Sequence, residues 1–322
     1  MKLNQVNSNP YKYSNTNKRY YTYDYYLKST FGGKVLKIPL DCGFTCPNID
    51  GKKGRGGCIY CSSRGSGDFA QLPSMTIKEQ YDAVREQMIK KWNTEMTILY
   101  FQAHTNTYAD ADTLKRLYTE ALSLPNVVGL NIATRADCLS DDVVGVLSQI
   151  AEKTVLTVEL GLQSAHDSTG KLINRCHTFA EFCEGYRKLK KANNKIQICI
   201  HLIEGLPCED HDMMLQTAMQ VARLHPEQVK LHCLYVIKGT KLHKMYTDGN
   251  YTPIPLDEYV SIICDTLEVL PEDTVIGRLT GDADRNELIE PIWSLKKTEV
   301  INMIDREMYR RESWQGKYYS IE

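Results

Sequence analysis

Short apolar runs alternate with helical segments through most of this 322-residue chain. The runs are rich in Val, Ile and Leu and show little polar alternation, as expected of strands that are covered on both faces. Repeated strand–helix units predict a parallel sheet with right-handed crossovers. Because eight units close a complete barrel, six favour an α/β fold with an open, partial TIM-type (β/α)6 barrel. The six predicted strands are 35–40, 97–102, 127–133, 155–160, 196–203 and 229–236.

The two ends of the chain differ in character from this repeating part. Residues 1–31 interleave tyrosines with Lys and Arg, and we expect an N-terminal arm. This arm either buries tyrosine rings against the main domain or contacts nucleic acid by stacking on bases and reaching phosphates. Residues 32–250 are expected to form the barrel, and residues 251–322 a small α/β C-terminal extension packed on its side. The extension is predicted to contain a helix, a strand and a second helix at 256–270, 274–279 and 295–310.

Charge and composition exclude several classes of protein. Lys and Arg total 39 and Asp and Glu total 40, so the chain is not a highly basic nucleic-acid coat, although a local basic face remains open. The sequence has no apolar run long enough for a membrane span and no secretory h-region at its start. We therefore expect a cytoplasmic protein without membrane contacts, whose eleven cysteines form no disulfide framework.

Four cysteines crowd into twenty residues directly after the first predicted strand: Cys42, Cys46, Cys58 and Cys61. Function collects at the carboxyl ends of strands in parallel barrels, so this position favours a functional cluster. A zinc site with four thiolate ligands would suit the C-x3-C and C-x2-C spacings and would indicate a zinc-stabilised RNA-binding protein without radical chemistry. An iron–sulfur cluster on Cys46, Cys58 and Cys61 would instead leave one iron open for a small molecule. The glycines between them would let the loop curl around a bulky cluster.

The stretch CPNIDGKKGRGGCIYC resembles the cluster loop of the radical S-adenosylmethionine superfamily. Its spacing is similar to the expanded C-x9–12-C-x2-C loop of the branch related to the Elongator catalytic subunit. By this resemblance Cys46, Cys58 and Cys61 are the metal ligands and Cys42 is a bystander. Later stretches that match the same branch include YFQAHTNTYAD, ATRAD, VELGLQS, NRCHT, HLIEGLPCED, KLHCLYVIKGTKL and RLTGDADRNELIEPIW. Together they are closest to the bacterial family that contains the MnmL proteins.

The resemblance implies a [4Fe–4S] cluster that reductively cleaves S-adenosylmethionine to methionine and a 5′-deoxyadenosyl radical. The radical would take a hydrogen atom from a substrate, and a flavodoxin- or ferredoxin-type protein would supply the electron. Glu159 and Gln163 would lie near the ribose, and Arg175 would face the methionine carboxylate, where a guanidinium can pair in bidentate fashion. The residues implied in cofactor binding are Gln102, Asn106, Thr134, Glu159, Gln163, Arg175 and His201.

The resembled family is associated with wobble-uridine modification in tRNA. The implied reaction converts 5-carboxymethylaminomethyluridine to 5-aminomethyluridine, and tRNA would be the partner. A small-molecule or protein substrate for the same radical chemistry remains open. The residues that would bind an anionic substrate or close the barrel mouth are Lys230, His232, Lys238, Arg278, Asp282 and Arg285.

Overall fold

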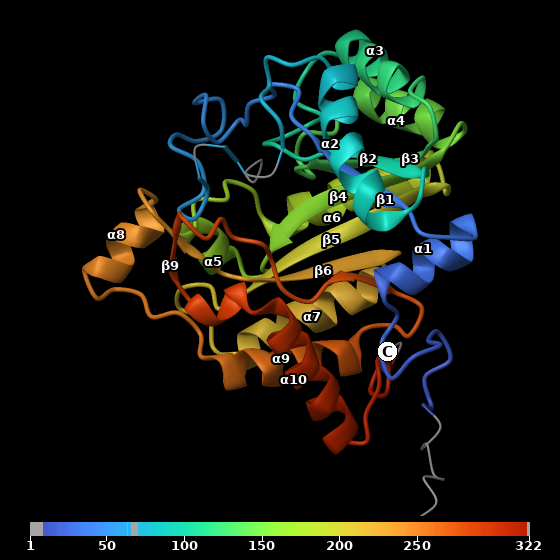
Figure 1. Cartoon of the computed structure of the whole chain (residues 1–322). Helices are drawn as coiled ribbons and strands as arrows, with labels where there is room; N and C mark the ends of the chain where they lie inside the picture. Colours follow the sequence, from blue (N-terminus) through green and yellow to red (C-terminus); the bar gives the residue numbers. More distant parts are fainter. Residues whose placement is uncertain (1–8, 63, 66–69, 321–322) are drawn as a thin grey trace, which may run out of the picture.

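The computed structural model describes residues 9–62, 64–65 and 70–320. In this part of the chain the main sheet has seven parallel strands in the order β1-β2-β3-β4-β5-β6-β8, curled into a half-barrel (Figure 1). The open partial barrel expected from the sequence is therefore confirmed. The strands are β1 Leu36–Leu40, β2 Thr97–Phe101, β3 Val127–Thr134, β4 Val155–Gln163, β5 Ile196–Glu204, β6 Gln228–Cys233 and β8 Val275–Arg278.

Strand β8 corrects the predicted number of strands in the barrel. The sequence placed this segment in the C-terminal extension, but β8 pairs in parallel with β6 and forms the seventh strand of the sheet. The predicted strand 229–236 was also too long, because β6 ends at Cys233 and Val236 belongs to a separate strand. The division of the chain at residues 31 and 250 itself stays a prediction.

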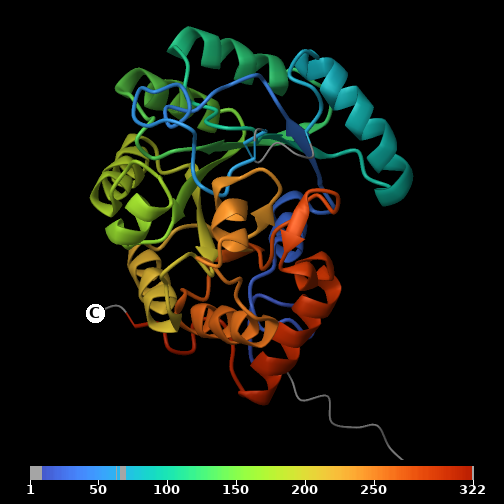
Figure 2. The same ribbon diagram turned by 90° about the vertical axis from the view of Figure 1, so that its left-hand side faces the viewer.

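Helices cover the outer face of the half-barrel (Figure 2). Capping boxes fix where two of these helices begin. The side chains of Thr76 and Thr178 each accept a hydrogen bond from the backbone N–H three residues later, and the glutamate at that later position accepts one from the backbone N–H of the threonine. The core lies between these helices and the sheet, where Leu99, Ile132 and Ile200 are fully buried. The main helices are α2 Ile77–Trp92, α3 Ala111–Leu122, α4 Asp141–Ala151, α6 Phe179–Ala192, α7 His211–Leu224, α9 Leu256–Val269 and α10 Lys297–Arg310.

Smaller elements lie near the carboxyl ends of the strands and around the C-terminal segment. They are α5 Asp167–Leu172, β7 Val236–Ile237, α8 Lys241–Thr247, β9 Leu288–Glu290 and the 3-10 helix η1 Ile292–Leu295. Strands β7 and β9 pair in antiparallel fashion. Within the described residues, no helix combines the length and the apolar character needed to cross a membrane.

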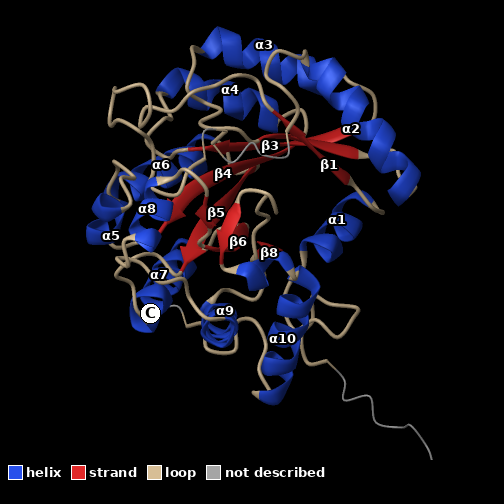
Figure 3. Ribbon diagram, turned by 60° about the vertical axis from the view of Figure 1, so that its left-hand side comes forward, coloured by secondary structure: helices blue, strands red, loops and turns tan. Residues whose placement is uncertain are grey.

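The N-terminal arm contains a helix that the sequence analysis missed, α1 Tyr23–Phe31. Thr22 caps its start and Gly32, at φ 76°, ends it in the left-handed conformation. The backbone N–H of Ile276 in β8 donates to the carbonyl of Tyr21 at 2.7 Å. Figure 3 shows α1 on the open side of the half-barrel, between the edge strands β1 and β8. The arm thus lies against the open edge, with residues 1–8 outside the described part.

Candidate active site

The inner face of the half-barrel is partly open to solvent. In β5 the outward residues Ile200 and Leu202 are buried under helices, whereas His201 and Ile203 are partly exposed. Alternation along a strand places these two pairs on opposite faces. The same partly exposed inner face continues on the other strands at Lys37, Pro39, Tyr100, Gln102, Ala133, Gly161, Gln163, His232 and Arg278. These residues line a lumen that leads to the carboxyl ends of the strands.

A buried carboxylate, Glu159 on β4, forms the centre of the lumen floor. It accepts hydrogen bonds from Nζ of Lys37 at 2.9 Å and from Nδ2 of Asn131 at 2.7 Å. Nε2 of His201 lies 2.8 Å from its second oxygen, which Nζ of Lys230 also contacts. Since β1, β4 and β6 are not neighbours in the sheet, these contacts require the side chains to point into the barrel.

Burial and charge set the protonation of this floor. Burial alone would raise the pKa of Glu159, but Lys230 and Lys37 hold it well below its usual value. Burial lowers the pKa of Lys37 to about 7, although Glu159 acts in the opposite direction. Burial, with Lys230 beside it, lowers the pKa of His201 to about 4, so this imidazole is neutral at pH 7. The ring of Tyr100 packs against both lysines, with its centroid 3.8 Å from Nζ of Lys37 and 4.8 Å from Nζ of Lys230.

The cysteine loop lies at the carboxyl ends of the strands and is fastened to the segment that follows α5. Nδ2 of Asn174 donates to the carbonyl of Gly57 at 2.7 Å. The N–H of Ile59 donates to the carbonyl of Ile173 at 3.1 Å. Gly56 and Gly57 adopt φ values of 76° and 70°, which only glycine adopts readily, so they allow the loop to turn towards Cys58.

The three cysteines Cys46, Cys58 and Cys61 fit an iron–sulfur cluster better than a zinc ion. All three are partly exposed, and Nδ2 of Asn48 lies 3.7 Å from the Cys58 sulfur, as amide donors do at cluster thiolates. Thiolates around zinc lie about 3.8 Å apart, given Zn–S bonds of about 2.3 Å. Among the described residues, these cysteines form no group whose sulfurs all lie within 4.8 Å of one another. The three sulfurs are therefore not drawn together as they would be around one zinc ion, and three soft donors in one loop suit an iron–sulfur cluster.

Cys42 has different surroundings. It packs against the main hydrophobic core, and burial together with Asp41 raises the pKa of its thiol to about 12. Burial also raises the pKa of the Cys58 thiol, although Arg135 acts in the opposite direction. The contact of Cys42 with the core, rather than its thiol pKa, supports the expectation that Cys42 is a bystander.

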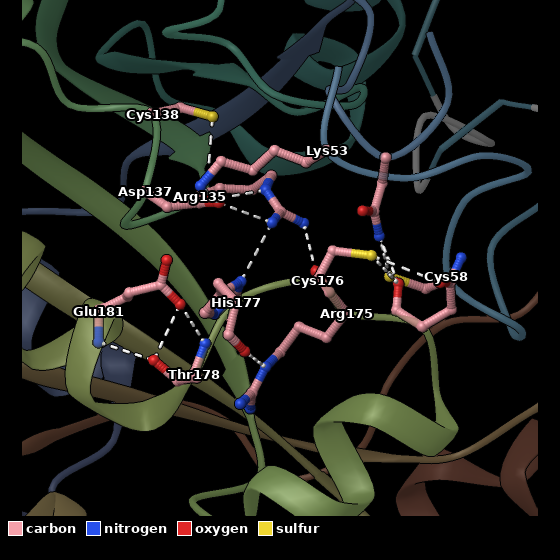
Figure 4. Close-up of polar contacts among 12 residues, drawn as sticks. Lys53, Cys58, Arg135, Asp137, Cys138, Arg175, Cys176, His177, Thr178 and Glu181 are labelled. Carbon is pink, nitrogen blue, oxygen red and sulfur yellow. Dashed lines mark hydrogen bonds and ion pairs between the residues drawn. The ribbon is translucent and has the colours of Figure 1, made fainter. Parts of the chain in front are cut away.

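Arg175 makes contacts that the sequence did not predict (Figure 4). Its side chain is 1% exposed. The guanidinium donates to the carbonyls of His177 at 2.9 Å, Leu162 at 2.6 Å and Ser164 at 2.5 Å. These hydrogen bonds hold the loop after β4 in place. Its predicted contact with the methionine carboxylate stays a prediction, and these backbone bonds argue against it.

A second arginine connects this loop to the cysteine loop (Figure 4). Arg135 donates through Nη1 to the carbonyl of Arg175 at 2.9 Å and through Nε and Nη2 to Asp137 at 2.9 Å. Nζ of Lys53, in the cysteine loop, lies 2.7 Å from Asp137. Burial would raise the pKa of Asp137, but Arg135 and Lys53 bring it down to about 2. The carboxylate thus stays charged and joins the two loops.

The remaining predicted cofactor residues fall into two groups. Asn106 donates to the carbonyls of Ala103 at 3.0 Å and Ala133 at 2.9 Å, and Oγ1 of Thr134 lies 2.6 Å from Oγ1 of Thr107. These contacts fasten the loops after β2 and β3. The partly exposed side chains Gln102 and Gln163 instead stand at the rim of the lumen, Gln163 at a bulge with φ 65°. Glu159 and His201 lie deeper, in the floor.

The predicted substrate residues fall into two groups: Lys230, His232 and Arg278 lie on neighbouring strands at the inner face, whereas Lys238, Asp282 and Arg285 lie outside it. Lys230 and His232 line the lumen, where the ring of His232 lies 5.2 Å from that of His201. Arg278 pairs with Asp282 at 3.2 Å near the edge formed by β8. Lys238 donates to the carbonyl of Asn286 at 2.6 Å beside β7, and Arg285 is exposed.

Residues 51–220 match the family described as the Radical SAM superfamily, which is more than half of the chain. This chain belongs to the radical SAM superfamily. Residues 226–310 match the Radical_SAM C-terminal domain. The cofactors of this radical SAM enzyme are a [4Fe–4S] cluster and S-adenosylmethionine.

Similar proteins place the chain in the Elongator-related branch of the superfamily. YtqA of Bacillus subtilis is 45% identical over 98% of this chain and 97% of its own length. YhcC of Escherichia coli is 34% identical over 87% of this chain and 89% of its own length. A tRNA uridine(34) acetyltransferase of Methanocaldococcus jannaschii is 25% identical over 54% of this chain and 32% of its own length.

A solved structure has the same fold as this radical SAM enzyme. The archaeal Elp3 of Methanocaldococcus infernus, lacking its N-terminus, superposes with a TM-score of 0.66 at 19% identity. The match covers 87% of this chain and 64% of the Elp3 chain, so our chain spans less than two thirds of that protein. At this identity the likeness concerns the fold.

Sequence reasoning missed several residues of the site. Lys37, Tyr100 and Asn131 lie in predicted strands and were read as part of the fold. Their positions on the inner face of their strands, shared with Glu159, would have been the available signal. Asn48 and Asn174, which contact the cysteine loop, lie in the matched stretches CPNIDGKKGRGGCIYC and NRCHT, but no role was assigned to them.

Proposed function

We propose that Cys46, Cys58 and Cys61 hold the cluster and that this radical SAM enzyme acts on the wobble uridine of tRNA. The reaction we propose converts 5-carboxymethylaminomethyluridine to 5-aminomethyluridine. A flavodoxin- or ferredoxin-type protein would supply the electron. The observation that carries the proposal is the lumen: its inner wall is partly exposed, bears several polar side chains and carries the charged cluster around Glu159.

The lumen would suit a single flipped-out base and its substituent better than an extended polymer. An enzyme that acts on a base substituent must take the nucleotide out of its stack and into a pocket. A narrow, partly exposed lumen would accept a base and its 5-substituent, while the rest of the RNA stayed outside. The relatives named as tRNA uridine(34) acetyltransferases support tRNA as the RNA concerned.

A cavity beside the cysteine loop would serve the outer part of the RNA. Its volume is 910 Å³, and its lining includes Lys52, Lys53, Lys188 and Tyr108. Lysines there would reach phosphates and the tyrosine would stack on a base. The lining also carries Asp137, Glu181 and Glu184, so the attraction would be local.

The proposed reaction balances in atoms and electrons. When bound, the cluster and S-adenosylmethionine supply one electron and an acceptor for one hydrogen atom. The substrate would lose that hydrogen atom from the carbon between its amine and its carboxylate, and one further electron would return to the cluster, which would leave a C=N bond. Water would then add, glyoxylate would depart, and the aminomethyl group would remain on the uridine. Overall, the substrate would be oxidised by two electrons at the expense of S-adenosylmethionine, giving methionine, 5′-deoxyadenosine and one proton.

Nucleoside analysis of cellular tRNA tests the proposal. Cells that lack the protein should accumulate 5-carboxymethylaminomethyluridine and lose the aminomethyl nucleosides derived from it. The wild-type gene should restore them, whereas a Cys58→Ser gene should not. An unchanged nucleoside profile in the deletion strain would reject tRNA as the substrate and favour a small-molecule or protein target.

A further inference from the structure

The floor of the lumen carries more positive than negative charge. Two ammonium groups, Lys37 and Lys230, contact one carboxylate, Glu159. Burial keeps His201 and His232 neutral, since it lowers the pKa of both imidazoles. When Lys37 is protonated, one buried positive charge is therefore left without a matching anion among the described groups of the floor. Such an imbalance is costly unless a further anion binds.

Access to the floor differs among the three charged side chains. The Lys37 side chain is 26% exposed, whereas Lys230 is 8% and Glu159 is 0% exposed. Among these three side chains, Lys37 is therefore the one that an anion entering through the lumen would meet first. Below the floor, Gln197 accepts from Tyr26 at 2.8 Å and from Gln228 at 2.9 Å, so these side chains are paired with one another.

Small residues lie above Lys37 on the inner face of the sheet. The inner positions of β1, β3 and β4 around this level carry short side chains or none, namely Pro39, Ala133 and Gly161, and all three are partly exposed. Gly161 lies beside His201 in the sheet register. A Cβ atom at Gly161 would approach Nε2 of Gln163 to 2.4 Å, so the Gln163 side chain lies over this glycine and would have to move if Gly161 were replaced.

We propose that Lys37, with Lys230 behind it, binds the carboxylate of the substrate's side chain at the lumen floor. The inference rests on the proposed function, because it assigns that carboxylate to the carboxymethylaminomethyl group. Burial lowers the pKa of Lys37 to about 7, and a bound carboxylate would favour its charged form. The carbon to be oxidised is bonded to the carboxylate, so fixing this anion would hold that carbon at a defined depth.

Binding of two RNAs to the cofactor-loaded enzyme, without reductant, tests the inference. Anticodon stem-loops carrying 5-carboxymethylaminomethyluridine or 5-aminomethyluridine at the wobble position differ by the carboxylate-bearing group. The wild type should bind the first more tightly, by about ten- to hundredfold, the value of a charged hydrogen bond. Lys37→Met should lose most of this preference, and Lys37→Arg should regain part of it. Lys90→Met, on the exposed surface of α2, should behave as wild type. A preference retained in the folded Lys37→Met protein would overturn the inference.

Chemical labelling of Lys37 separates this inference from the tRNA proposal. N-methylglycine carries the same amine and carboxylate as the substrate side chain, and methylamine lacks the carboxylate. N-methylglycine should slow acetylation of Lys37 by acetic anhydride, measured by peptide mass spectrometry, and methylamine should not. Protection without any tRNA turnover would support the anion site and reject the tRNA proposal. Turnover of tRNA without protection of Lys37 would support the tRNA proposal and reject the anion site.

Discussion

The side-chain amide of Asn174 donates to the carbonyl of Gly57 at 2.7 Å and joins residues 117 positions apart. It also donates to the carbonyl of Arg55 at 3.2 Å. One side chain thus holds the glycine-rich turn just before Cys58. Asn174 has φ 57°, a conformation that favours Asn and Gly over other residues.

Replacing Asn174 by Gly should loosen the cysteine loop without straining the backbone, because glycine adopts the same φ readily. We expect faster loss of iron to a chelator, with little change in overall fold by circular dichroism. Asn126→Gly is the matched control, since Asn126 has φ 58° far from the cysteines, before β3. Equal rates of iron loss in the two variants would refute the role of Asn174.

The cysteines should differ in their effect on the cluster. Cys58→Ser should abolish it, because the thiolate is lost, whereas Cys42→Ser should retain about four irons and four sulfides per chain. Iron, sulfide and zinc are measured on anaerobically reconstituted protein. If the Cys42 variant lost as much iron as the Cys58 variant, the result would indicate a site with four cysteine ligands.

Arg175 should contribute to stability through its buried backbone contacts. Arg175→Lys cannot satisfy the three carbonyls at His177, Leu162 and Ser164 in the same geometry, and we expect the free energy of unfolding to fall by about 2–4 kcal/mol in urea. Arg116→Lys, at an exposed pair on α3, should cost less than about 0.5 kcal/mol. If Arg175→Lys had unchanged stability but bound S-adenosylmethionine more weakly, Arg175 would instead be a cofactor-binding residue, as the sequence predicted.

A buried carboxyl at the end of β5 should make stability depend on pH. Burial, with Glu209 nearby, raises the pKa of Glu204 to about 8 from its ordinary 4.5. Between these values the folded chain binds a proton that the unfolded chain does not, so rising pH lowers the free energy of unfolding. Glu204→Gln removes this contribution.

The variant should therefore gain stability relative to wild type between about pH 6 and about pH 8, measured by urea unfolding. Glu258→Gln, at an exposed site on α9, should show a pH-independent difference from wild type. A pH-independent difference for Glu204→Gln as well would contradict the raised pKa.

The sequence predicted the repeating part of the fold well for a physical reason. Buried parallel strands leave long apolar runs, and the intervening helices carry clear caps such as Thr76 and Thr178. Strand β8 was predicted as a strand at 274–279 but was assigned to the C-terminal extension, because β7 and α8 interrupt the strand–helix repeat before it. Helix α1 is rich in tyrosine, a modest helix former, and its Thr22 and Gly32 caps were the overlooked signal.

The candidate site was less predictable than the fold. A motif places Cys46, Cys58 and Cys61 in one loop, but the partners of a buried charge depend on which strands face one another across the lumen. Lys37 and Glu159 lie 122 positions apart in the sequence and meet only because the sheet curls. Motif matching also predicted that Arg175 binds the methionine carboxylate of S-adenosylmethionine, although its guanidinium donates hydrogen bonds to backbone carbonyls.

Conversion of tRNA by the purified enzyme tests the central claim most directly. The reconstituted protein is incubated anaerobically with S-adenosylmethionine, a reductant and tRNA that carries 5-carboxymethylaminomethyluridine, and the digested nucleosides are quantified. We predict 5-aminomethyluridine, with one glyoxylate and one 5′-deoxyadenosine for each conversion, and none with the Cys58→Ser protein. Formation of 5′-deoxyadenosine while the nucleoside stays unchanged would contradict the account.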